Sequence, residues 1–161
     1  MAELEPAFAF VLDNEGGLED NSADAGGVSK FGISSVLLAR LHPDWDVRTL
    51  TAEQARVIYL ENFWAPIHGD EISDQKLANK LLDMTVNLGY GAAVKLLQRA
   101  LGTPQDGILG TDTLKLLNTT NSDTLLLEIK ARLCEYYTRT VLKNPTDVTF
   151  LLGWLRRAVR P

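Results

Sequence analysis

The placement of helix breakers and capping residues along the chain most constrains its fold. After residue 34, apolar residues recur at helical spacing, and Gly, Pro or a capping residue repeatedly interrupts them. Thr51 and Gln54 form the sequence signature of a capping box, and Ser73 is expected to cap the next helix. The predicted helices span residues 34–41, 51–64, 74–88, 92–101, 111–117, 122–143 and 148–159. This pattern predicts a mainly α-helical protein.

The N-terminal region follows a different pattern. An apolar stripe with helical spacing predicts a first helix, which Gly16 and Gly17 are expected to end. Residues 21–27 are dense in turn formers, and residues 28–33 alternate apolar and polar side chains. We therefore expect a small β-hairpin within residues 18–33 and a mainly α (α+β) fold. The stripe consists of Leu4, Ala7, Phe8, Val11 and Leu12.

Charge is distributed unevenly along the 161 residues. The net charge is −5 and the pI is about 5.0, but residues 130–161 carry seven Lys and Arg against two acidic residues. This basic C-terminal segment is either a set of solvated helix faces or a surface that contacts an anionic bacterial envelope. The acidic balance and the lack of a recognition motif argue against nucleic acid as a partner.

The chain offers few signals for export, metals or cofactors. Its N-terminus is acidic, and the apolar stretch 7–12 is too short for a signal-peptide core, so we expect synthesis in a cytoplasm without an export signal. His42 and His68 have no partner at metal-ligand spacing, and Cys134 is the one cysteine. We therefore expect no metal, no cofactor and no internal disulfide.

The position of Glu15 suggests acid chemistry. It lies eleven residues after Leu4, which returns it to nearly the same helical face, at the helix C-terminus. Burial and the negative end of the helix dipole both disfavour an ionised carboxyl, as a glycosidase general acid requires. Asp24 is the leading second carboxylate, ahead of Asp20 and Glu19, and Asp13 is weaker because it lies before the helix end. A solvated helix end and an ordinary turn aspartate are the alternative interpretations.

Seven blocks of the chain together resemble the glycoside hydrolase family 108 lysozymes, which are N-acetylmuramidases found among phage endolysins. The resemblance implies a lysozyme-like fold with Glu15 as the catalytic acid, and it puts Ser29 in place of a threonine common in the family. It also implies a single domain over residues 1–161, with a catalytic lobe (1–89) and a peptidoglycan-binding-like lobe (90–161). The blocks are residues 15–17, 24–33, 59–64, 82–89, 96–102, 106–111 and 153–157.

Substrate contacts follow from the same resemblance. Asn87 matches the family's asparagine and could bind an N-acetyl group. Tyr59, Trp64 and Tyr90 could stack on sugar rings, although aromatic residues at helical spacing are also typical of a core. Ser29 could help Asp24 to hold a water molecule.

The expected function is hydrolysis of the β-1,4 bond between N-acetylmuramic acid and N-acetylglucosamine. We expect a monomer that stays in the host cytoplasm until it is released to the cell wall. A lytic transglycosylase, a non-catalytic peptidoglycan-binding module and a secreted toxin are the rival interpretations.

Overall fold

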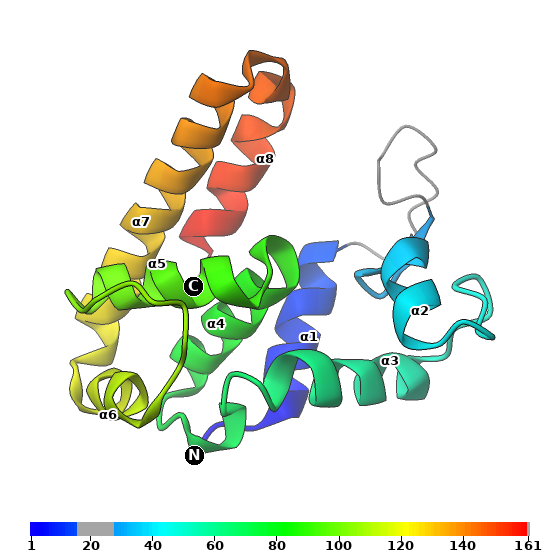
Figure 1. Ribbon diagram of the computed structural model, residues 1–161, viewed down its shortest axis with the longest axis horizontal. Helices are drawn as coiled ribbons and strands as arrows, with labels where there is room; N and C mark the ends of the chain where they lie inside the picture. Colours follow the sequence, from blue (N-terminus) through cyan, green and yellow to red (C-terminus); the bar gives the residue numbers. More distant parts are fainter. Residues whose placement is uncertain (16–27, 161) are drawn as a thin grey trace.

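A computed structural model describes residues 1–15 and 28–160, including all of their side chains except those of Asn14 and Glu15. These residues are mainly helical with one short antiparallel hairpin, which confirms the predicted fold class (Figure 1). Its strands are β1 (Ser29–Lys30) and β2 (Ile33–Ser34). The helices are α1 (Leu4–Glu15), α2 (Ser35–Leu41), α3 (Ala52–Tyr59), η1 (Leu60–Trp64), η2 (Gly69–Glu71), α4 (Gln75–Leu88), α5 (Tyr90–Ala100), α6 (Thr111–Thr119), α7 (Ser122–Lys143), η3 (Pro145–Asp147) and α8 (Val148–Val159).

The caps explain where these helices begin. The Thr51 hydroxyl accepts a hydrogen bond from the Gln54 backbone N–H, and the Gln54 side chain accepts one from the Thr51 backbone N–H, which confirms the predicted capping box. The helix then continues as the π-helical turn η1. The prediction for Ser73 was wrong by one residue. Asp74 caps α4 instead, because its carboxylate accepts from the Leu77 backbone N–H at 3.0 Å.

The hairpin is shorter than its prediction. Ser29 pairs with Ser34 and Lys30 pairs with Ile33, so the connecting loop is Phe31-Gly32. Both loop residues have positive φ, 55° and 72°, as a type I′ turn requires. The prediction of a hairpin within 18–33 is therefore confirmed for its C-terminal part, while residues 18–27 lie outside the described residues.

Helix α4 is central to the packing. The predicted stripe on α1 is buried at Leu4, Ala7, Phe8 and Val11, and α1 packs along α4. Helices α5 and α7 contact other parts of α4, and α7 and α8 form an antiparallel pair that extends away from it (Figure 1). The hairpin and α2 lie on the opposite side of the molecule. Within the described ranges, no helix has the length and apolarity needed to cross a membrane.

Candidate active site

Helix α1 carries the proposed acid at its C-terminal end. Glu15 is the last residue of α1, and that end lies between α4 and the hairpin side of the molecule (Figure 1). Ser29 lies in β1 and is half-buried. The Glu15 side chain and the whole of Asp24, Asp20 and Glu19 lie outside the described part, so the roles of these carboxylates stay predictions.

A cavity of about 290 Å³ opens between the hairpin, α2, η1 and the C-terminal end of α4. It combines the aromatic ring of Phe63, the cationic side chain of Arg40 and the Asn62 amide, whose Nδ2 donates to the Ile58 carbonyl at 3.1 Å. Mixed apolar and polar surface of this kind suits a sugar. Its lining residues are Gly32, Leu37, Arg40, Leu41, Asn62, Phe63, Thr85, Val86 and Gly89.

None of the polar lining residues of this cavity was selected from the sequence. Asn62 and Phe63 lie in the block 59–64, so the family resemblance carried a signal for both residues. Arg40 had no signal, because only the fold brings α2 to the end of α4.

The predicted stacking residues Tyr59 and Trp64 belong to the core. Both are buried, with 0% and 1% of their surface exposed, so their ring faces are not available to a sugar. Tyr59 donates its hydroxyl to the Phe31 carbonyl at 3.0 Å and so holds the hairpin turn. Trp64 donates its indole N–H to Asp70 at 2.8 Å. Aromatic residues at helical spacing are typical of a core, and this alternative describes both rings.

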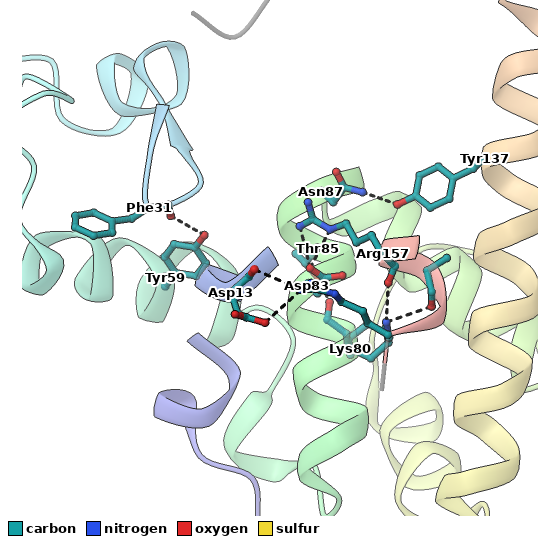
Figure 2. A network of polar contacts seen from close by, with 12 residues as sticks. Asp13, Phe31, Tyr59, Lys80, Asp83, Thr85, Asn87, Tyr137 and Arg157 are labelled. Carbon is teal, nitrogen blue, oxygen red and sulfur yellow. Dashed lines mark hydrogen bonds and ion pairs between the residues drawn. The ribbon is translucent and has the colours of Figure 1, made fainter. Parts of the chain in front are cut away.

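Asn87 and Tyr90 lie at the junction of α4 and α5. Asn87 is exposed, and its Nδ2 donates to the Tyr137 hydroxyl (Figure 2). The half-buried Tyr90 accepts a hydrogen bond at its hydroxyl from the Leu109 backbone N–H at 3.1 Å. Tyr90 therefore positions the loop before α6, and sugar contacts by Asn87 and Tyr90 stay predictions.

A second, smaller cavity of about 170 Å³ lies beside Asn87. One wall is aromatic, because the rings of Tyr137 and Trp154 stack with centroids 5.4 Å apart and Phe150 continues the series at 5.9 Å from Trp154. Burial raises the pKa of Tyr137 to about 12, so its hydroxyl keeps its proton. Trp154 lies in block 153–157, but sequence reasoning gave it no role. The lining residues are Asn87, Leu88, Tyr136, Tyr137, Thr140 and Trp154.

A polar network, buried at Lys80 and Asp83, joins α4 to α8 near the end of α1 (Figure 2). Arg157 forms an ion pair with the buried Asp83 at 2.8 Å, and Arg160 reaches Asp13 on α1 at 3.3 Å. Lys80 is fully buried and donates to the carbonyls of Arg157 and Ala158, each at 3.2 Å. Burial lowers the pKa of Lys80 to about 8, although the charge of Asp83 opposes that shift.

The histidines show no metal-binding arrangement. His42 stacks on Trp45 with ring centroids 4.0 Å apart, and His68 bonds Glu71 at 2.9 Å. Among the described residues, no group of three or more His, Cys, Asp or Glu side chains could hold a metal ion.

The fold and these cavities define a lysozyme-like protein, and comparison with known proteins makes the class specific. Residues 8–89 match the family described as "Glycosyl hydrolase 108", and residues 92–159 match a "Predicted Peptidoglycan domain". The solved structure titled "Structure of Brucella abortus SagA" is 30% identical with a TM-score of 0.80, over 95% of this chain and 87% of that one. No curated protein sequence matches. The chain belongs to the glycosyl hydrolase 108 family and is a glycoside hydrolase that acts on peptidoglycan.

Proposed function

We propose that the enzyme hydrolyses the β-1,4 bond between N-acetylmuramic acid and N-acetylglucosamine, with Glu15 as the general acid. The observation that carries this proposal is that α1, with its buried apolar stripe, ends at Glu15 between α4 and the hairpin. The family match supplies the substrate class. The negative end of the α1 dipole disfavours an ionised carboxylate there, which helps an acid to keep its proton.

The remaining steps need a second group. Glu15 gives its proton to the glycosidic oxygen as the bond from that oxygen to the sugar C1 breaks. Water then adds to C1 and gives its proton to Asp24, either directly or through a second water molecule. The Ser29 hydroxyl would orient the attacking water from β1.

Glu15→Gln is the decisive variant, because it keeps the shape of the side chain and removes the proton. We expect it to lower the release of reducing sugars from purified sacculi by about 10²–10⁴-fold, the usual contribution of a general acid. Asp13→Asn is the matched control. Asp13 lies two residues earlier on α1, its carboxylate is exposed, and its substitution should change the rate less than about twofold.

Three outcomes would contradict this mechanism. Wild-type activity in Glu15→Gln would remove Glu15 from the chemistry. Products that end in an anhydro sugar would identify a lytic transglycosylase. Binding of sacculi by the wild type without release of reducing sugar would leave a non-catalytic binding module.

We also propose that residues 1–89 and 90–161 are two lobes of one domain. The contacts that α4 makes with both α5 and α7 support this, because they join the two matched segments through one continuous core. Separate expression of residues 1–89 tests it. An isolated lobe that unfolds cooperatively at the temperature of the full chain would contradict it.

We propose further that the enzyme works as a phage endolysin, which reaches the wall from the cytoplasm once another protein opens the membrane. Its support is the resemblance of the N-terminal block to that type of lysozyme. Lysis of expressing bacteria only after the membrane is permeabilised would support the role, and lysis without permeabilisation would contradict it.

A further inference from the structure

A basic pocket lies between α5 and α7, away from the cavity at the hairpin. Its volume is about 310 Å³. Lys95 and Arg99 supply two cations from consecutive turns of α5, and Arg139 and Lys143 supply two from consecutive turns of α7. We call it the α5–α7 pocket. Its lining residues are Ala92, Lys95, Leu96, Arg99, Gln105, Tyr136, Arg139, Thr140 and Lys143.

The two cations on α5 have acidic neighbours. Arg99 forms an ion pair with Glu135 at 2.7 Å, and Glu135 also binds Arg132 at 2.9 Å. The pKa of Asp106 is lowered chiefly by a hydrogen bond from Gln98 and, in smaller part, by the charge of Lys95. Arg132 also pairs with Glu128 at 3.1 Å, so these two arginines face two carboxylates, and Lys95 supplies the positive charge that remains on the α5 side of the pocket.

The two cations on α7 carry their full charge to the pocket. Within the described ranges, neither Arg139 nor Lys143 has an ion-pair partner, and both side chains are exposed. Their spacing of four residues puts like charges on one helical face, which costs free energy in an empty pocket. A bound anion would remove that repulsion, so the pocket is suited to an acidic ligand.

The pocket adjoins the smaller cavity beside Asn87. Tyr136 and Thr140 line both the α5–α7 pocket and the smaller cavity beside Asn87. Asn87 follows Thr85 and Val86, which line the cavity at the hairpin. A single molecule could therefore extend from the end of α4, across one face of α7, to the four cations.

We propose that the α5–α7 pocket binds the carboxylates of peptidoglycan stem peptides while the glycan strand lies in the active site. This inference rests on the proposed function. It identifies the stem peptide as the part of the substrate by which the pocket selects peptide-bearing strands. A stem peptide leaves the glycan at the lactyl group of muramic acid and carries several carboxylates, which match cations grouped in a cavity. The net charge of −5 disfavours long polyanions such as nucleic acid.

Direct binding tests the pocket independently of catalysis. The probe is a synthetic stem tetrapeptide with free carboxylates, titrated into the full-length protein, and the same peptide with its carboxyls amidated is the chemical control. We expect Arg139→Ala/Lys143→Ala to weaken binding of the free acid about tenfold, as loss of two charge-assisted contacts predicts. The amidated peptide should bind all variants equally weakly.

Lys76→Ala/Lys115→Ala is the matched control variant. It removes the same charge from exposed positions on α4 and α6 that do not line the pocket. Its affinity for the free-acid peptide should stay within about twofold of wild type, since distant surface charges are screened. Equal losses in the two double variants would overturn the proposal, as would binding of inorganic phosphate as tight as that of the tetrapeptide.

Steady-state kinetics on two substrates provides the second test. We expect Arg139→Ala/Lys143→Ala to raise KM about tenfold on peptide-bearing strands and to leave KM unchanged on strands from which an amidase has removed the peptides. Equal effects on both substrates would overturn the proposal. If the wild type cleaves neither substrate, the proposed function fails, and the tetrapeptide titration still decides whether the pocket binds acidic peptides.

Discussion

The end of α1 lies between two structures that are held in different ways. On one side, β1 and β2 contribute two residues each, and their turn receives a hydrogen bond from the Tyr59 hydroxyl. On the other side, α8 is tied to α4 by the buried pair of Asp83 and Arg157 and by Lys80, which donates to two carbonyls of α8 (Figure 2). The hairpin side is held by a few neutral hydrogen bonds, and the α8 side is held by buried charged groups.

This difference indicates which side of the site can move at a small cost in free energy. A two-residue hairpin contributes few hydrogen bonds of its own, so it can shift at small cost. A buried ion pair tolerates little displacement, because each charge depends on the other for solvation. We therefore infer that α4 and α8 form the fixed wall of the site and that the hairpin is the adaptable one.

The largest expected effect comes from breaking the fixed wall. Asp83→Ala leaves the guanidinium of Arg157, which is only 17% exposed, without the carboxylate of Asp83. We expect the free energy of unfolding to fall by about 3–5 kcal/mol, as for other buried ion pairs that lose one partner. Urea denaturation followed by circular dichroism measures it.

Glu5→Ala is the control for that prediction, because it breaks the ion pair of Glu5 with Arg56 at the exposed surface. We expect a change of about 0–1 kcal/mol, since solvent screens exposed pairs. Similar losses of unfolding free energy in the two variants would show that the buried α4–α8 ion pair stabilises the fold no more than an exposed pair does.

Short sequence patterns predicted the helix boundaries well, because capping and helix breaking depend on residues only a few positions apart. The capping box at Thr51 and the break at Asn144-Pro145 both act within a few residues, and the structure has α3 and α8 where they indicate. The hairpin was harder. Its turn has Phe31 at positive φ, where Gly or Asn is expected. The sequence therefore predicted the strands by their alternating pattern but did not predict the position of the turn.

The site was less predictable because its contacts join distant residues. Asp83 and Arg157 are separated by 74 positions, and neither carries a sign of its partner. The sequence identified Tyr59 and Trp64 as aromatic residues of either the core or a sugar site but could not say which of the two they contact. The basic C-terminal segment shows the same limit, since Arg157 is ion-paired inside the fold and Arg160 is ion-paired to Asp13 at the surface.

A second prediction concerns pH and the fixed wall. Burial lowers the pKa of Lys80 in the folded protein from its ordinary value of 10.5 to about 8. Between those pH values the unfolded chain holds the proton and the folded chain releases it, so stability rises with pH, by up to about 3 kcal/mol. The charged groups around it are Asp83, Lys130, Arg157 and Arg160.

The comparison of wild type with Lys80→Met between about pH 7.5 and about pH 10 isolates this contribution. The unfolding free energy of the wild type should increase relative to that of the variant as the pH rises. Parallel pH profiles would mean that Lys80 keeps its ordinary pKa despite its burial, and the α8 side would then depend on hydrogen bonds more than on buried charge.

The smallest expected effect tests the adaptable wall. Tyr59→Phe keeps the buried ring and removes the hydroxyl that donates to the Phe31 carbonyl. One neutral hydrogen bond contributes about 1 kcal/mol, so the free energy of unfolding should fall by roughly that amount. Activity on sacculi should fall by a larger factor than stability alone predicts, because the turn positions β1 and with it Ser29. Unchanged activity together with the expected loss of stability would show that the hairpin needs no precise placement for catalysis. Only the α4–α8 wall would then define the geometry of the site.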